Sequence, residues 1–167
     1  APVKAYQLLA TKQADWGKWH IYHGDERCLP VSDAERNSLV AEQQWLNLVA
    51  IPKAQIHNIP AELGAEAGAE QYAAVVADAG TFDLVLLGMG EDGHTASLFP
   101  GHVHHEDELT HAVHNSPKPP ADRVSISAKA LSNTAELIFV VSGDKKEALA
   151  AWQNKEDLPV THLCPES

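Results

Sequence analysis

Glycines, an aspartate and a histidine follow one apolar run of this sequence, and together they are typical of a site that moves protons. The run covers residues 82–87, and Gly90, Asp92, Gly93 and His94 come soon after it. An unperturbed imidazole titrates near pH ~6.5, so His94 can act as a general base at neutral pH while Asp92 orients its ring. Gly90 and Gly93 let the backbone approach a ligand closely. The alternative is an ordinary Asp-Gly turn whose backbone satisfies His94.

A carboxylate and a guanidinium follow a shorter apolar run at residues 19–22. They are Asp25 and Arg27, and they are two positions apart. The planar fork of Arg27 suits an anionic oxygen, and Asp25 is expected to face the same crevice. Such a cluster is more often a solvated surface ion pair. Its place at the end of a predicted strand favours a binding site.

Two further cations are candidates for holding a phosphate. Arg123 follows a proline-rich stretch, and Lys146 comes three residues after Gly143, near the start of a predicted helix. Helix amides and a nearby lysine together form an anion site, although a lone lysine in a first turn is more often simply solvated. The adjacent Lys145 is interpreted as such a solvated residue.

Five histidines lie in the segment 101–120, at positions 102, 104, 105, 111 and 114. Imidazoles are common zinc ligands, but no two of these histidines have the His-x-x-x-His spacing that places ligands on one face of a helix. We therefore expect a long functional loop and no metal site.

Strands and helices alternate in the predicted order of elements. Apolar runs between turn residues predict strands at 19–22, 82–87 and 137–141, and helical spacing predicts helices at 38–48, 65–79 and 145–152. Residues 124–126 are expected to add another strand. The alternation indicates a parallel sheet covered by helices, in which ligands bind at the carboxyl ends of the strands.

Composition narrows the functional classes. The 167 residues include 23 acidic and 12 basic ones, a formal net charge of −11, which argues against nucleic-acid binding through a broad basic surface. No apolar run approaches the roughly 20 residues that span a bilayer, so neither a membrane nor a secreted protein is predicted. Cys28 and Cys164 are far apart in the sequence and favour a reducing cytoplasm.

Four strings of residues together resemble the 6-phosphogluconolactonase family. They are GDER at 24–27, LLGMGEDGHTASLFPG at 86–101, SPKPPADRVSIS at 116–127 and VSGDKKEAL at 141–149. They occur in that family's order and approximate spacing, and the resemblance covers nearly the whole chain. The glycine-histidine string is highly specific in this combination, whereas GDER alone is a weak signal.

The resemblance implies an α/β, Rossmann-like three-layer fold with a mostly parallel central sheet, related to glucosamine-6-phosphate deaminase. It implies hydrolysis of 6-phospho-D-glucono-1,5-lactone to 6-phosphogluconate in the oxidative pentose phosphate pathway, without an organic cofactor or an obligatory metal. His94 would be the general base and Asp92 the motif aspartate. Asp25 and Arg27 match the family's acidic-basic signature, and Arg123 and Lys146 resemble phosphate-binding residues of the wider superfamily.

The chain also departs from the family pattern. It begins after the position of the family's Gly-Gly-x-Thr-Pro phosphate loop and stops soon after residues 161–163, so we expect one partial domain over 1–167, incomplete at both ends. Two other functions stay open, a sugar-phosphate deaminase or isomerase and a noncatalytic sugar-phosphate binding module. Residues 95–99 and the GDER string favour the lactonase.

Overall fold

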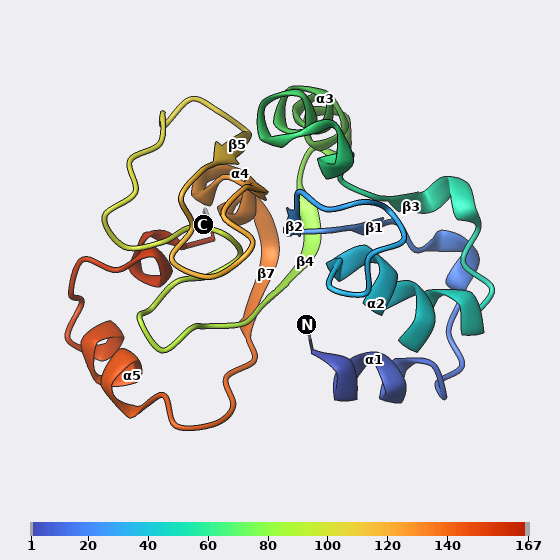
Figure 1. The fold of residues 1–167 in the computed structure, drawn as a ribbon. Helices are drawn as coiled ribbons and strands as arrows, with labels where there is room; N and C mark the ends of the chain where they lie inside the picture. Colours follow the sequence, from blue (N-terminus) through green and yellow to red (C-terminus); the bar gives the residue numbers. More distant parts are fainter. Residues whose placement is uncertain (1, 166–167) are drawn as a thin grey trace.

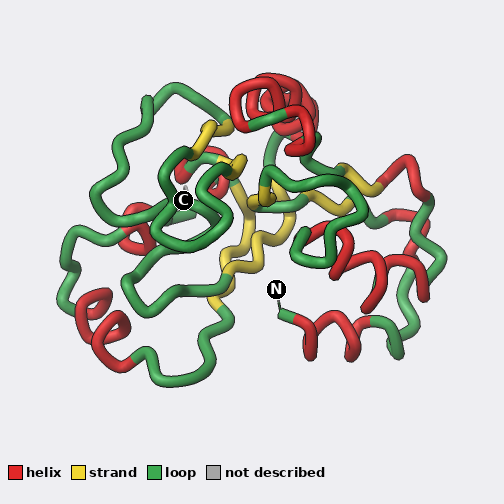
Figure 2. The backbone as a smooth tube through the Cα atoms, viewed as in Figure 1, coloured by secondary structure: helices red, strands yellow, loops and turns green. Residues whose placement is uncertain are grey.

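Two parallel strands run through the middle of the molecule (Figures 1 and 2), in a computed structural model that describes residues 2–165. They are β4 (Phe82–Leu87) and β7 (Thr134–Phe139), paired in a register that sets Leu86 beside Ile138. Alternation along each strand sends Val85 and Leu87 into the largest core cluster. The carboxyl end of β4 leads directly into residues 88–93, the glycine-rich loop.

Two further sheets lie beside this pair. The strands β1 (Ile21–Tyr22) and β3 (Ile56–His57) are parallel. The strands β2 (Asp25–Arg27), β5 (Thr110–Val113) and β6 (Arg123–Ile126) form an antiparallel sheet with β6 in the middle. All four residues of β6 are buried, so this sheet belongs to the core.

Five α-helices surround the strands: α1 (Val3–Leu9), α2 (Asn37–Gln44), α3 (Ala65–Ala79), α4 (Ala128–Ser132) and α5 (Lys146–Gln153). Short 3-10 turns lie at Trp16–Lys18, Leu46–Leu48, Lys53–Gln55, Ala61–Leu63 and Pro159–His162. The alanine-rich α3 packs closely on β6. A Cβ added to Gly68 of this helix would lie only 3.0 Å from Val124 Cγ2.

The predicted α/β class is confirmed, and the helix at 65–79 and the strand at 82–87 have the predicted bounds. The strand predicted at 137–141 starts earlier, at Thr134, and ends at Phe139. The antiparallel sheet was not predicted. Its strand β5 lies inside the segment 101–120, which was expected to be a loop, and β2 occupies part of the expected loop after residue 22.

Two predicted elements are shorter than expected. Only Ile21–Tyr22 of the strand predicted at 19–22 pairs with a neighbour. The helix predicted at 38–48 ends at Gln44, because Trp45 has a φ of −151° that no α-helix contains, and a 3-10 turn follows. The first residue of this helix is Asn37, one position before the predicted start, and the cap position is Arg36.

One face of the β4–β7 pair remains partly open to solvent. Leu84, Leu86, Ile138 and Val140 are 49%, 41%, 38% and 46% exposed, although strands of parallel sheets are usually covered on both faces. The opposite face carries the core.

A buried ion pair fixes β2 against the start of α2. Glu26 is 0% exposed, and its carboxylate accepts hydrogen bonds of 2.8 Å from the backbone amides of Arg27, Asn37 and Ser38. Arg36, 2% exposed, places its Nε 3.5 Å from Glu26 Oε2, an ionic contact at the long limit of hydrogen bonding. Arg36 also donates to Ile59 O at 2.9 Å. The pair therefore connects three separate segments.

Replacing Glu26 by alanine should lower the free energy of unfolding by about 3–5 kcal/mol, because a buried guanidinium would lose its counter-charge and the amides their acceptor. Urea unfolding followed by tryptophan fluorescence measures this loss. The matched control is Glu62→Ala, which removes the partly exposed second carboxylate of Arg36 and should cost about 1 kcal/mol or less. Equal losses in the two variants would contradict a central role for Glu26.

Candidate active site

The segment after β4 folds back on itself and brings Asp92 and His94 together. The Gly90 amide donates to His94 O at 2.8 Å, and the Gly93 amide donates to Gly90 O at 3.2 Å. Gly93 has a φ of +78°, a conformation that favours glycine. The Thr95 hydroxyl donates to Gly88 O at 2.8 Å and closes the loop from its far end. These bonds give the loop one defined shape.

His94 and Asp92 form the central pair of the site. His94 Nδ1 lies 2.5 Å from Asp92 Oδ1, and the His94 amide lies 3.2 Å from the same oxygen. With the carboxylate beside Nδ1, that nitrogen carries the hydrogen, and Nε2 is the nitrogen left for proton transfer. The His94 side chain is 19% exposed, so a water molecule or a ligand can reach it.

The charge of Asp92 is maintained by this contact. Burial acts to raise the pKa of Asp92, but the hydrogen bonds from the His94 ring and amide outweigh it, and the net pKa is lowered. Asp92 therefore stays ionised at neutral pH. It can orient the imidazole and stabilise the imidazolium that forms when Nε2 takes a proton.

Gly90 forms one wall of the histidine site. A Cβ on this residue would lie 2.0 Å from His94 Nδ1, 2.1 Å from its Cε1 and 2.8 Å from Asp92 Oδ1. No side chain fits there, so glycine is required for the imidazole to meet the carboxylate. Gly93 is restricted as well, since its added Cβ would lie 2.8 Å from Leu158 Cδ1.

A buried aromatic ring forms the other wall. Phe99 is 3% exposed, and its ring centroid lies 4.9 Å from that of His94. The guanidinium carbon of Arg123 stands over the same ring, 5.7 Å from its centroid. Phe99 was not predicted to be functional, because an apolar residue in a glycine-rich string has no chemical signature.

The two candidate arginines lie directly opposite each other, since Arg27 of β2 pairs with Arg123 of β6. Like charges in such positions destabilise a sheet. Arg123 is 5% exposed, and it donates to the carbonyl oxygens of Pro120 at 3.2 Å and of Lys118 and Pro119 at 3.0 Å. Burial lowers the pKa of Arg123, although Asp25 acts in the opposite direction.

Arg27 makes one side-chain hydrogen bond among the described residues. Its Nη1 donates to Glu35 O, whereas its buried Nε has no hydrogen-bond partner among the described residues. Neither Arg27 nor Arg123 forms a salt bridge within residues 2–165. Two neighbouring guanidinium groups without carboxylate partners are suited to an anion with several oxygens, such as a phosphate.

Asp25 connects several segments of the site through its carboxylate. Its Oδ2 accepts a hydrogen bond of 2.6 Å from the Ser97 hydroxyl, and its Oδ1 accepts one of 3.1 Å from Asn37 Nδ2. Asp25 was predicted to face a ligand. The structure instead gives both of its oxygens protein partners, so that Asp25 connects β2 and α2 to the segment after His94.

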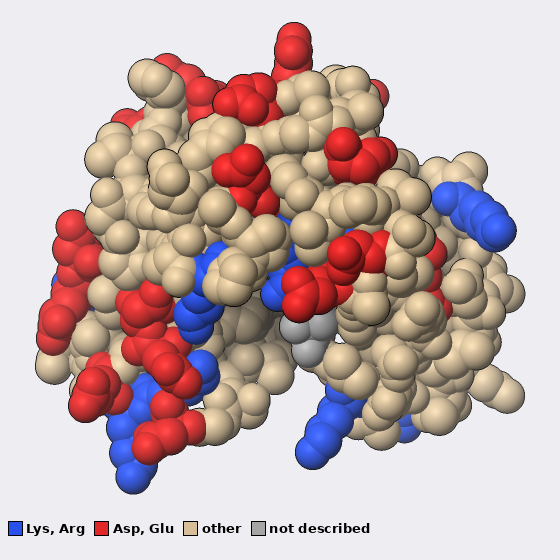
Figure 3. Space-filling view, in the orientation of Figure 1, with Lys and Arg blue, Asp and Glu red and all other residues tan. Residues whose placement is uncertain are grey.

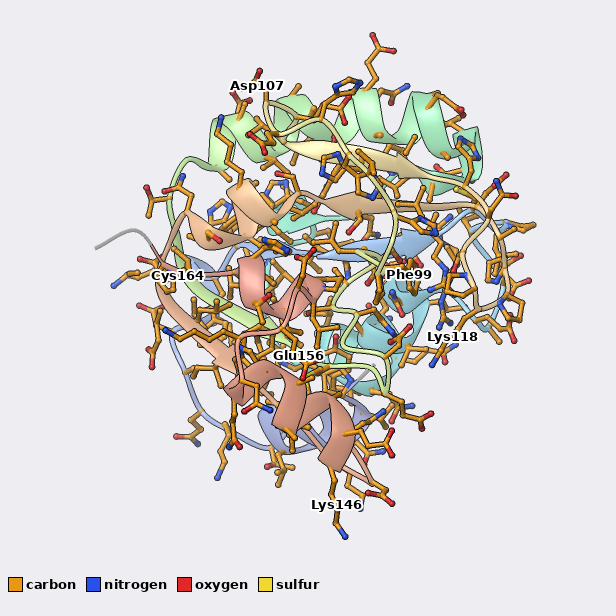
Figure 4. All side chains as sticks on the ribbon, turned by 90° about the vertical axis from the view of Figure 1, so that its left-hand side faces the viewer. Phe99, Asp107, Lys118, Lys146, Glu156 and Cys164 are labelled. Atoms are coloured by element: carbon orange, nitrogen blue, oxygen red, sulfur yellow. The ribbon has the colours of Figure 1, made fainter. Side chains whose placement is uncertain are left out.

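The two adjacent lysines differ in position. Lys146, the residue indicated by the sequence, is the first of α5, is exposed and points away from the body of the molecule (Figure 4). Lys145 lies one residue earlier, its side chain is 18% exposed, and its Nζ is 3.9 Å from Glu91 Oε1 in the glycine-rich loop. The structure therefore brings Lys145, and not Lys146, beside Glu91 of the glycine-rich loop.

The histidines of segment 101–120 make contacts with each other and with carboxylates. The rings of His104 and His111 are stacked at 4.2 Å, and His111 Nδ1 lies 2.7 Å from Glu108 Oε2. His114 lies between Glu66 Oε1 at 2.6 Å and Asp122 Oδ1 at 2.9 Å. Among residues 2–165, no group of three or more potential ligands is arranged to hold a metal ion.

Cys28 is not supported as a nucleophile. Burial is the largest of the effects that raise the pKa of the Cys28 thiol to about 11, so this thiol is protonated at neutral pH. The acid-base pair His94 and Asp92 is the better candidate for chemistry.

Known proteins resemble this chain in sequence and in fold. The sequence profile described as "Glucosamine-6-phosphate isomerases/6-phosphogluconolactonase" matches residues 1–167. The chain belongs to this family. The 6-phosphogluconolactonase of Mycobacterium leprae is 39% identical over 160 residues, covering 86% of this chain and 65% of its own length. A probable chloroplastic 6-phosphogluconolactonase of Oryza sativa subsp. indica is 35% identical over 165 residues, covering 86% of this chain and 51% of its own length.

Solved structures of the family have the same fold. The crystal structure of 6-phosphogluconolactonase from Thermotoga maritima superposes with a TM-score of 0.91 at 28% identity, covering 97% of this chain and 75% of that chain. A monomeric glucosamine-6-phosphate deaminase superposes with a TM-score of 0.72 at 18% identity over 83% of this chain and 65% of that chain, a likeness of fold alone. The chain spans only about half to two thirds of the curated relatives described above.

Within residues 2–165, no helix combines the length and the apolar character that crossing a bilayer requires.

Replacing Gly90 by alanine should displace the His94 ring and lower the free energy of unfolding by about 1–3 kcal/mol, because the added methyl group overlaps the imidazole. NMR spectra of the imidazole, together with urea unfolding, measure both effects. The matched control is Gly88→Ala, whose added Cβ has its nearest neighbour at 4.0 Å and should change neither property. An unshifted His94 signal in Gly90→Ala would contradict the described contact.

Proposed function

We propose that this chain carries the active site of a 6-phosphogluconolactonase, which hydrolyses 6-phospho-D-glucono-1,5-lactone to 6-phosphogluconate in the oxidative pentose phosphate pathway. The observation that carries the proposal is the pair of Asp92 and His94, held 2.5 Å apart with Nε2 of the ring left for proton transfer. Membership of the family and relatives of this name support the substrate. A cytoplasmic location is part of the proposal, and both cysteines are free thiols, as expected there.

In the proposed reaction His94 acts in both halves. Its Nε2 removes a proton from water while the water oxygen forms a bond to the lactone carbonyl carbon, and the carbonyl oxygen becomes an oxyanion. The intermediate then collapses, the bond between that carbon and the ring oxygen breaks, and the imidazolium returns the proton to the departing oxygen. Asp92 stabilises the imidazolium between the two steps. One base thus serves attack and departure.

The oxyanion needs donors from the loop. The amides of Gly90 and Gly93 already bond to carbonyl oxygens within the loop, so we assign this role to other amides of residues 88–92. A well-placed donor of this kind contributes about 3 kcal/mol to stabilising a transition state. Gly90 and Gly93 then act on the substrate indirectly, by permitting the loop to adopt its shape.

The phosphate is proposed to bind at Arg27 and Arg123, with a lysine from the start of α5. Local cations must attract it, since the formal net charge of the chain is −11. Figure 3 shows Lys and Arg side chains beside the hollow in the middle of one face, with acidic side chains next to them and around the rim. Binding the phosphate away from the reacting carbon supplies energy that orients the lactone ring.

Replacing His94 by asparagine should reduce the turnover of freshly prepared lactone by roughly 100-fold or more, since a positioned general base contributes about 10²–10⁴-fold. The assay subtracts spontaneous hydrolysis and uses this chain. The control His20→Asn alters an exposed histidine of another segment and should leave turnover unchanged.

Unchanged turnover in His94→Asn would overturn the catalytic role of His94. Binding of 6-phosphogluconate without turnover by the unaltered chain would instead support a noncatalytic sugar-phosphate binding module. Release of ammonia from glucosamine 6-phosphate, measured in the same preparation, tests the deaminase alternative.

The neighbouring lysines provide a matched pair of variants. Lys145→Met should raise the KM for the lactone several-fold with little change in kcat, because Lys145 is the lysine whose side chain faces the glycine-rich loop. Lys146→Met should change neither constant. Steady-state kinetics at low salt measure both variants. A larger rise in KM for Lys146→Met would support Lys146, the residue that the sequence indicates.

A further inference from the structure

Phe99 lies between the proposed base and a proposed phosphate-binding cation. The centroid of its ring lies 4.9 Å from the centroid of the His94 ring, and Arg123 Cζ lies 5.7 Å from the same Phe99 centroid. Figure 4 shows Phe99 on the backbone segment that follows the glycine-rich loop. We propose that Phe99 is a positioning residue, which holds the His94 imidazole in the orientation that directs Nε2 at the substrate.

A tight turn brings Phe99 back to His94. Thr95 and Leu98 bond to each other through their backbones, with distances of 2.9 and 3.3 Å, and Ala96 between them has a φ of +48°. Ser97 is anchored at the same turn, because its amide donates to Ser125 Oγ at 3.2 Å and its hydroxyl donates to Asp25. The position of Phe99 is thus fixed by strands β2 and β6, not by His94 itself.

The imidazole needs a second wall. Asp92 holds one ring nitrogen, and Gly90 closes the side on which no Cβ fits. A single hydrogen bond leaves a ring free to swing about its side-chain torsions, and contact with a buried aromatic ring restricts that motion. Phe99 is the described aromatic residue that packs directly against His94.

Arg123 depends on Phe99 much less than His94 does. Its guanidinium donates three hydrogen bonds to the carbonyl oxygens of Lys118, Pro119 and Pro120. Loss of the ring would therefore leave the cation in place and release the imidazole. This asymmetry separates the expected effect on catalysis from any effect on phosphate binding.

The test replaces Phe99 by leucine, which keeps an apolar side chain and removes the planar ring, and by tyrosine, which keeps the ring. The kinetic part rests on the proposed function. Phe99→Leu should lower kcat roughly tenfold, with KM within about twofold, since small misplacements of a catalytic group cost up to 10²-fold. Phe99→Tyr should recover most of the rate. The control Phe82→Leu makes the same change at a partly buried residue packed on the core and should retain kcat.

An NMR readout tests positioning without turnover. The proton on His94 Nδ1, held by Asp92 at 2.5 Å, should give a downfield resonance in the unaltered chain and in Phe99→Tyr. The resonance should broaden or disappear in Phe99→Leu. If Phe99→Leu fails to fold, Phe99→Met replaces it in both measurements.

Loss of the resonance together with loss of rate supports the proposal. A retained resonance in a folded Phe99→Leu or Phe99→Met protein overturns it, whether or not the chain hydrolyses the lactone. A chain without turnover in which Phe99→Leu still removes the resonance would refute the lactonase and leave the positioning role of Phe99 supported.

Discussion

The buried ion pair of Glu26 and Arg36 is the contact on which the geometry of the site depends. Side chains alternate along a strand, so burying Glu26 turns its neighbours Asp25 and Arg27 to the other face of β2. The same register pairs Arg27 with Arg123. A charge buried this deeply costs several kcal/mol, and three backbone amides and a guanidinium offset that cost. Glu26, which has no proposed contact with the substrate, thereby fixes the positions of Asp25 and Arg27.

Local signals in the sequence were enough to predict the central elements. The helix α3 is a long alanine-rich segment, and β4 is an apolar run that ends at glycine, so both could be predicted with their bounds. The strand predicted at 124–126 is present as β6, but its antiparallel pairing with the three-residue β2 joins segments nearly 100 positions apart and was not predicted. Short strands carry little periodicity, and their stability comes from partners that the local sequence does not reveal.

The candidate site shows the same division between local and distant contacts. Asp92 and His94 are two positions apart, and a local loop brings them together, so their pairing could be foreseen. Asp25 looked like a ligand-binding carboxylate, because its partner Ser97 is 72 positions away in the sequence. The choice between Lys145 and Lys146 depends on where α5 begins, and one residue of shift rotates a side chain by about 100° around a helix. Boundaries of this kind are beyond what residue patterns define.

The two ends of the proposed site are held by different means. Arg123 is held by three carbonyl oxygens, and Arg27 donates to Glu35 O, so both guanidinium groups have defined places without an anion. An anion bound at the proposed site would reduce their mutual repulsion. His94 instead has one short hydrogen bond and two walls, Gly90 and Phe99. A base must change its charge twice in each turnover, so contacts that restrict its rotation without occupying Nε2 suit it better than further hydrogen bonds would. In the proposed site the two arginines orient the substrate, and His94 keeps Nε2 available for proton transfer.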